Sequence, residues 1–233
     1  MIFSLLASEG SWADKLIYLA LFLIVIVVSL SFHEWAHAHA AHCMGDDTAL
    51  NMGRMTLNPL AHLHPLGFIS MLIIGFGWAK PVPVNPRNYR NYKWGEFRVS
   101  FAGIFTNLII AIVSSFIYVG LWYYELRSGR TLPDNLFTLL YLFGIVNCSL
   151  AVFNFIPIYP LDGYHIFELV FGKLIGYKAV FWIRTHGNYI FYGFMALSIV
   201  LSNVLGVSPA GFVADWIYDK ILQAFVLLFS LIP

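Results

Sequence analysis

Charged side chains are scarce in this sequence. Only 11% of its 233 residues are Asp, Glu, Lys or Arg, whereas 60% are apolar. Soluble domains carry about 25% charged residues, so a water-soluble fold of this length could not cover its surface with so few. The composition therefore predicts an integral membrane protein whose main surroundings are the lipid bilayer.

Cysteine and an excess of one charge are lacking as well. The two cysteines, Cys43 and Cys148, are not spaced as C-x-x-C, which excludes a disulfide framework and a thiolate zinc site. The 13 Lys and Arg nearly balance the 12 Asp and Glu, so no nucleic acid partner is expected. The first 15 residues contain no early basic cluster, which argues against a cleavable secretory signal.

Long uncharged runs predict the transmembrane helices, because a spanning helix needs about 20 mainly apolar residues. Four runs qualify: 16–32, whose helix continues to about residue 43, then 99–124, 135–161 and 187–214. Gly206 and Pro209 should end the fourth helix near Asn203. The tail 221–233 is too short alone, and either spans together with 211–220 or lies at the interface.

These runs predict an α-helical polytopic membrane protein with about four to six transmembrane helices. At this length there is room for one membrane-embedded domain over 1–233, with a core of about 16–177 and C-terminal helices over about 178–233. The apolar piece 66–79 is too short to span. It contains Gly67, Gly75 and Gly77 and runs into a proline-rich stretch, which predicts a re-entrant β-hairpin over 67–86. Such backbone at membrane depth should line a cavity.

The basic residues predict the orientation, because they gather in cytoplasmic loops. If the four spans alternate, one side holds nine basic residues and the other holds four: Arg54, Lys80, Arg87, Arg90, Lys93, Arg98, Lys173, Lys178 and Arg184 against Lys15, Arg127, Arg130 and Lys220. This places residues 43–98, and with them the hairpin, on the cytoplasmic side, and the N-terminus outside.

The strongest chemical pattern lies where the first apolar run ends. His33, Glu34 and His37 form H-E-x-x-H, and residues four apart share one face of a helix, so both imidazoles can reach one metal ion. In this pattern the glutamate acts as a general base beside zinc. The pattern also occurs on solvated helix faces, but here it follows an apolar run, where an unpaired glutamate is costly. It therefore predicts a zinc site.

A catalytic zinc ion takes three protein ligands and keeps a position for water. Most of the other acidic residues lie in predicted loops, at span ends or in the tail, which leaves Asp162 as the third ligand. Under the predicted orientation Asp162 falls at the same cytoplasmic depth as the two histidines. Pro157 and Pro160 break the helix before it and place it on an irregular turn. The alternative is an ordinary Asp-Gly turn that faces water.

Two motifs together resemble those of the site-2 protease family, zinc metalloproteases that cleave peptide bonds within membranes. They are His33-Glu34-x-x-His37 and Asn154-x-x-Pro157-x-x-x-Leu161-Asp162-Gly163, and the weaker element Gly103-Ile-Phe-Thr-Asn107 opens the second long span. The resemblance covers about residues 16–205 and is closest to short prokaryotic members without a PDZ domain. Ile104 departs from the pattern, because relatives often carry proline there.

The resemblance implies a function for each motif. His33, His37 and Asp162 would bind one Zn²⁺ per chain, Glu34 would activate the water, and Asn107 and Asn154 would stand near the oxyanion. Either asparagine could instead form an interhelical hydrogen bond. The substrate would be a transmembrane protein segment, unwound for cleavage and held by the free strand edges of the hairpin. The location would be the inner cell membrane, with the active site toward the cytoplasm.

Other functions remain possible on the sequence. A metal transporter could use the same histidines and aspartate but has no need of Glu34, and an inactive scaffold of the family would not need the intact ligand set. A membrane di-iron oxidase would need several pairs of histidines on different helices, which this sequence does not contain. The histidines His39, His42, His62 and His64 are expected to be interfacial or hydrogen-bonded, with gating or a second metal as lesser alternatives.

Overall fold

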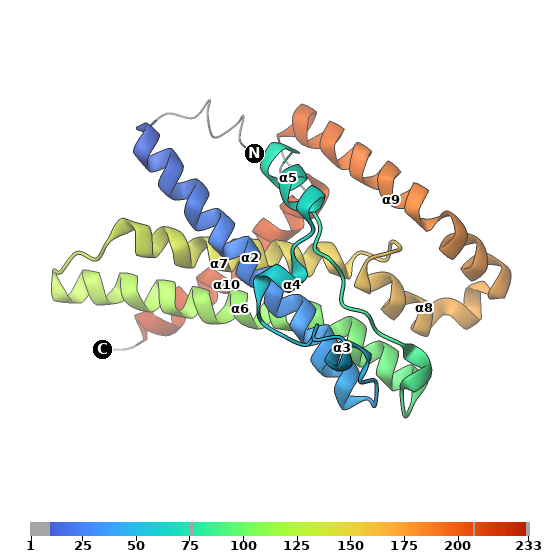
Figure 1. Ribbon diagram of the computed structural model, residues 1–233. Helices are drawn as coiled ribbons and strands as arrows, with labels where there is room; N and C mark the ends of the chain where they lie inside the picture. The colour runs from blue at the N-terminus through green and yellow to red at the C-terminus, as the bar shows by residue number, and fades with distance from the viewer. Residues whose placement is uncertain (1–9, 75–76, 207, 232–233) are drawn as a thin grey trace.

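The computed structural model describes residues 10–74, 77–206 and 208–231, and in this part of the chain it is built from helices (Figure 1). No strand forms among these residues, and the only β-type pairing there is one isolated antiparallel bridge between Leu63 and Ala79. The helices are α2 (Trp12–Cys43), α3 (Thr48–Asn51), α4 (Pro59–His62), α5 (Pro65–Ile74), the 3-10 turn η1 (Pro86–Asn88), α6 (Tyr92–Ser128), α7 (Asp134–Phe155), α8 (Asp162–Ile175), α9 (Tyr177–Leu205) and α10 (Pro209–Ser230).

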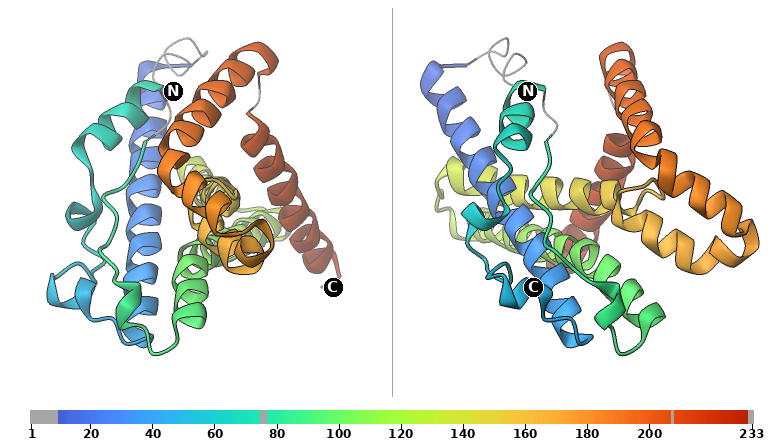
Figure 2. Two further views of the ribbon diagram at one scale, coloured as in Figure 1. Left: turned by 90° about the vertical axis from the view of Figure 1, so that its right-hand side faces the viewer. Right: turned by 45° about the vertical axis from the view of Figure 1, so that its right-hand side comes forward.

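Three long helices form the centre of the molecule. Helices α6 and α7 run side by side as an antiparallel pair, and α2 crosses them (Figures 1 and 2). Helix α6 ends at Ser128, and the next residue, Gly129, has a φ of 66°, a left-handed conformation that glycine adopts without strain. Helix α10 packs against this pair through Tyr218, which lies in a buried cluster with Ala111 and Cys148. Helix α2, which carries His33, Glu34 and His37, also packs against α6.

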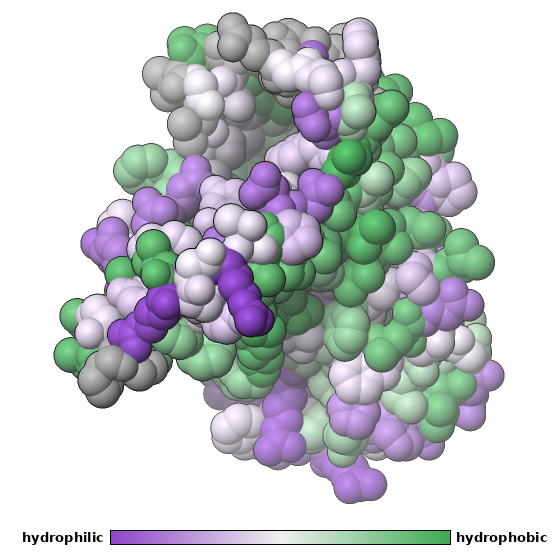
Figure 3. All heavy atoms as spheres, turned by 90° about the vertical axis from the view of Figure 1, so that its left-hand side faces the viewer, coloured by the Kyte–Doolittle hydropathy of each residue, from purple (hydrophilic) through white to green (hydrophobic). Residues whose placement is uncertain are grey.

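Helices α2, α6 and α7 are long and apolar enough to cross a membrane. Only about a third of each apolar stretch is buried inside the protein, so most of its side chains face outward. One face accordingly shows broad areas of hydrophobic residues, with hydrophilic residues gathered along the lower rim and on a projecting part (Figure 3). The 37 residues of α6 would extend about 55 Å, so its charged first turns can lie beyond a hydrocarbon layer of about 30 Å.

The expected number of four to six spans is not confirmed. Within the described residues three helices qualify. The fourth expected run, 187–214, is not one helix, because α9 ends at Leu205 with Gly206 at a φ of 77° and α10 starts at Pro209. That break lies within a few residues of its expected place. The C-terminal residues join 211–220 in one helix, which carries Asp215, Asp219 and Lys220.

The expected β-hairpin over 67–86 is wrong for its first arm. Residues 65–74 form helix α5, and the second arm is extended, with one isolated β-bridge, at Ala79, among the described residues. Gly67 does not make a turn. A Cβ atom at Gly67 would lie 2.1 Å from the carbonyl oxygen of Trp78, so this glycine allows the two backbones to touch. Gly75 lies outside the described residues.

Candidate metal centre

Helix α2 carries the H-E-x-x-H pattern into the interior of the protein. The helix contains neither glycine nor proline between Trp12 and Cys43, so the apolar run continues into the motif without a break. His33, Glu34 and His37 are at most 9% exposed. Three polar side chains buried on one helix need partners from elsewhere, because an unpaired buried polar group is costly.

Asp162 supplies the third group, from the first turn of α8. Its Oδ2 atom lies 3.4 Å from Nε2 of His33 and 3.3 Å from Nε2 of His37, and the two Nε2 atoms are 3.0 Å apart. Gly163 permits this approach, because a Cβ atom there would lie 2.2 Å from the carbonyl oxygen of Phe155. The side chains predicted from two distant motifs therefore converge at one point, and an ordinary water-facing Asp-Gly turn is not what forms.

Hydrogen bonds on the far side of each imidazole fix its tautomer. Nδ1 of His37 lies 2.7 Å from the carbonyl oxygen of Val99, which can only accept, so this Nδ1 carries the proton. Nδ1 of His33 lies 2.6 Å from Oδ1 of Asn107. Neutral imidazole protonated at Nδ1 presents a lone pair at Nε2. Both rings therefore direct their ligand atoms toward Asp162.

The orientation of Asn107 is itself fixed by a chain of buried amides. Asn147 on α7 donates through Nδ2 to the carbonyl oxygen of Phe143 and to Ser29 Oγ, so its Oδ1 faces Asn107 and accepts from Asn107 Nδ2 at 2.7 Å. Asn107 must then present its oxygen to His33. Asn107, Asn147 and Ser29 are completely buried, one on each of the three long helices. The packing of these helices thus sets the direction of the His33 lone pair.

These contacts make the site suitable for a cation. Two imidazole lone pairs and a carboxylate oxygen meet with no donor hydrogen between them, and Asp162 Oδ2 is buried without a hydrogen bond. The three ligand atoms all lie within 4.8 Å of one another. A positive ion would relieve the repulsion among them, and N and O donors of this kind are ligands of zinc. In the described part of the chain, no other group of three such residues is placed to hold a metal.

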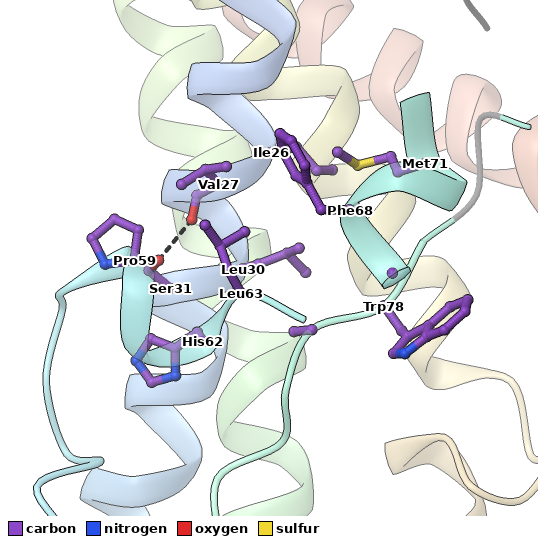
Figure 4. A pocket seen from close by; sticks show the side chains of 12 residues that line it. Ile26, Val27, Leu30, Ser31, Pro59, His62, Leu63, Phe68, Met71 and Trp78 are labelled. Carbon is purple, nitrogen blue, oxygen red and sulfur yellow. Dashed lines mark hydrogen bonds between the residues drawn. The ribbon is translucent and has the colours of Figure 1, made fainter. Parts of the chain in front are cut away.

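Glu34 lies beside the three ligands and has a separate partner. Its Oε2 accepts a hydrogen bond of 2.8 Å from the backbone N–H of Val82, in the extended segment that follows Trp78. This segment runs down past the apolar pocket between α2, α4 and α5, in which Leu30 and Phe68 line the wall and Ser31 turns back to Val27 (Figure 4). One oxygen of the glutamate is thus bound by the backbone of this segment.

The remaining predicted residues lie elsewhere. Asn154 donates through Nδ2 to Leu150 of its own helix at 3.0 Å. The four histidines that were not predicted as ligands have separate partners. His39 stacks on Trp35 and His42 pairs with Asp47. His62 contacts the carbonyl oxygen of Thr56, and Nδ1 of His64 accepts a hydrogen bond from the Gly67 N–H. Within the described residues none of them joins the metal group.

Sequence reasoning missed Asn147, Val99 and Val82. Asn147 carried a usable signal, since it is a polar residue inside an apolar helix, two turns before Asn154 on the same face. Val99 acts through its carbonyl oxygen and Val82 through its N–H, groups that every residue other than proline possesses, so no sequence pattern distinguishes them.

Gly103 offers a test of this geometry. A Cβ atom there would lie 2.5 Å from Cε1 of His33 and 2.6 Å from Nε2 of His37, so the Gly103→Ala variant must displace both rings. We expect its metal content, measured by elemental analysis, to fall sharply, although alanine favours a helix by about 1 kcal/mol over glycine. Gly193→Ala on α9 is the matched control, because nothing lies within 4 Å of its Cβ position. Equal metal content in the two variants would contradict the proposed site.

Known proteins resemble this chain in sequence. Residues 123–198 match the family described as Peptidase family M50. A protein of Bacillus subtilis named "Putative zinc metalloprotease YwhC" is 40% identical over 160 residues, which are 66% of this chain and 73% of that protein. "Putative zinc metalloprotease Rip2" of Mycolicibacterium smegmatis is 30% identical over 164 residues, 65% of this chain and 58% of that protein.

An archaeal protein shows the same similarity at lower identity. "Zinc metalloprotease MJ0392" of Methanocaldococcus jannaschii is 26% identical over 161 residues, 69% of this chain but only 37% of that protein. The chain therefore spans most of the Bacillus subtilis relative and a smaller part of the others. No solved structure is similar enough to the chain to count as a match.

Proposed function

This chain belongs to peptidase family M50, the family of site-2 proteases, and from that premise we propose that it is a zinc metalloprotease that cleaves peptide bonds within the membrane. The observation that carries the proposal is the convergence of His33, His37 and Asp162 beside Glu34, at the end of a helix apolar enough to span. The substrate is a transmembrane segment of another protein. We further propose one domain over 1–233, with its core at about 16–177.

Zinc fits the donor set of the site. Two imidazoles and one carboxylate leave a fourth tetrahedral position for water, which is the arrangement of a catalytic zinc ion. We assign His33, His37 and Asp162 as the ligands of one ion per chain. When bound, zinc supplies Lewis-acid activation of the water and of the substrate carbonyl. Asn107 and the carbonyl oxygen of Val99 hold the two rings in place, as outer-sphere partners of ligating histidines do.

Glu34 is the general base in this proposal. Its carboxylate takes a proton from the attacking water while the water oxygen bonds to the carbonyl carbon, and it returns the proton to the nitrogen as the C–N bond breaks. Asn107 is occupied by His33 and Asn147, which supports a positioning function. Asn154 bonds, within the described chain, only to its own helix, and we retain it as a donor to the developing oxyanion.

The membrane setting follows from the same elements. Basic residues are in excess between the C-terminal end of α2 and the first turns of α6. This excess supports an active site toward the cytoplasm and an N-terminus outside, in the inner cell membrane. A helical substrate has its carbonyl groups tied in i to i−4 hydrogen bonds. It must therefore unwind before a carbonyl group can reach Glu34.

The proposal is tested on the purified full-length protein. We expect about one zinc per chain by elemental analysis, and cleavage of single-span test proteins inside their transmembrane segments, located by mass spectrometry. A chelator should stop cleavage, and added zinc should restore it. Bound zinc without cleavage of any test protein would favour an inactive scaffold or a transporter, which transport of labelled zinc into vesicles would separate.

A further inference from the structure

Residues 79–85 form an extended segment over the catalytic helix, here called the strap. Lys80 N–H donates to the carbonyl oxygen of His62 at 2.7 Å, next to the bridge between Leu63 and Ala79. Arg54 Nη2 donates to the carbonyl oxygens of Lys80 and Pro81 at 2.9 and 3.1 Å. These contacts fix the end of the strap that follows Trp78.

Asp46 fixes the other end. This carboxylate is fully buried just beyond α2, where Oδ2 accepts from the N–H of Asn85 at 2.6 Å and Oδ1 accepts from Asn88 Nδ2 at 2.8 Å. Burial alone would raise the pKa of Asp46, but the hydrogen bonds from Asn85, Thr48 and Asn88 outweigh it and lower the pKa below its usual range. The carboxylate therefore stays charged at neutral pH and keeps hold of the strap.

The middle of the strap contacts Glu34. Val82 is 8% exposed and packs in a buried cluster with Ala38 and Ala49, while its N–H donates to Glu34 Oε2. Val82 thus binds one carboxylate oxygen and leaves Oε1 without a protein hydrogen bond in the described chain. A carboxylate buried beside a metal site needs such a donor, because hydrogen bonds to a charged group are among the strongest in proteins.

The Val82 N–H lies between two prolines of the strap. Pro81 and Pro83 have no N–H, so the peptide groups on either side of Val82 offer no donor. Within residues 81–83 the Val82 N–H is therefore the one backbone donor, and it is bound to Glu34. Val84 has an N–H, but it has no hydrogen-bond partner among the described residues.

We propose that the Val82 N–H is a positioning group for the general base, Glu34. The strap, fixed by Arg54 and Asp46, holds this N–H against the carboxylate. The inference rests on the proposed function. The hydrogen bond fixes the rotamer of Glu34, so that Oε1 faces the water while Oε2 remains bound to the strap. Val82 touches neither substrate nor metal, and it acts through Glu34.

Two matched substitutions isolate the N–H. Val82→Pro and Val84→Pro each place a third proline among those of the same extended segment, but only the first removes a bonded N–H. We expect Val82→Pro to lower kcat about tenfold to a hundredfold, the worth of a hydrogen bond to a charged group, with KM and zinc content unchanged. Val84→Pro measures the effect of an added proline in the strap without the loss of a hydrogen bond, and the loss of kcat in Val82→Pro must exceed it by about tenfold.

Val82→Ala separates the packing of the side chain from the N–H, because it shortens the side chain and keeps the donor. The loss in Val82→Pro must exceed the loss in Val82→Ala by about tenfold. Equal losses, or a Val82→Pro variant with normal kcat, would overturn the proposal. If Val82→Pro does not fold, Arg54→Met loosens one end of the strap and should also lower kcat at constant zinc content; an unchanged kcat there would count against the strap.

Hydrogen exchange provides a readout that does not depend on activity. Glu34→Ala removes the acceptor and Glu34→Gln retains one, so exchange at the Val82 amide, followed by mass spectrometry on a peptide over 78–86, should accelerate in the first variant only. Equal exchange rates in the two variants would contradict the hydrogen bond between Val82 and Glu34 and overturn the proposal. If the unmodified protein cleaves nothing but this difference is found, the proposed function fails while the positioning contact stands.

Discussion

Glu34→Gln should retain the zinc and lose cleavage by about 10²- to 10⁴-fold, the usual contribution of a general acid or base. The amide has nearly the size and shape of the carboxylate and can still accept the hydrogen bond from Val82 through its oxygen. It cannot take a proton from water at neutral pH. The geometry of the site is therefore preserved while the proton transfer is lost, and single-turnover cleavage of a transmembrane test protein measures the effect.

The control for Glu34→Gln is Glu168→Gln. Glu168 lies on α8, the helix that begins with Asp162, but pairs with Arg184 through two hydrogen bonds of 2.6 and 2.9 Å and takes no part in the metal group. Its variant should cleave at a rate close to that of the unmodified protein, after correction for any change in melting temperature. Turnover by Glu34→Gln within tenfold of normal would remove the assignment of the general base.

Asp162→Ala should bind zinc far more weakly than the unmodified protein. Loss of an outer-sphere partner typically costs about 10- to 100-fold in metal affinity, and loss of a direct ligand should cost more. The substitution leaves only His33 and His37, whose Nε2 atoms are 3.0 Å apart, to hold the ion. Competition with a zinc-binding dye gives the affinity directly.

Asp134→Ala is the matched control for Asp162→Ala. Both aspartates are the first residue of a helix, so both substitutions remove a carboxylate that interacts favourably with the helix N-terminus. Asp134 is exposed and lies outside the metal group, so its variant should keep its zinc affinity. Full zinc occupancy in Asp162→Ala would mean that the third ligand has been assigned wrongly.

The short apolar segment after His64 shows a limit of reasoning from glycine and proline. Gly67, Gly75 and Gly77 together with the following prolines predicted a hairpin, yet residues 65–74 are helical. Gly67 and Gly77 serve close contact instead, since a Cβ atom at Gly77 would lie 2.2 Å from the carbonyl oxygen of Gly67. Glycine permits both a turn and a close approach, and the sequence does not distinguish these uses.

The sequence alone determined the helical membrane architecture and predicted the H-E-x-x-H motif as a metal site. Both depend on local periodicity: apolar runs of spanning length form helices, and residues four apart on a helix share a face, as His33 and His37 do. It also named Asp162, because acidic residues in such a composition are few. Only the tertiary structure decided which atoms converge. Asn147 orients the amide that orients His33, and the Val82 N–H reaches Glu34, because these contacts join segments distant in the chain through groups that leave no periodic pattern.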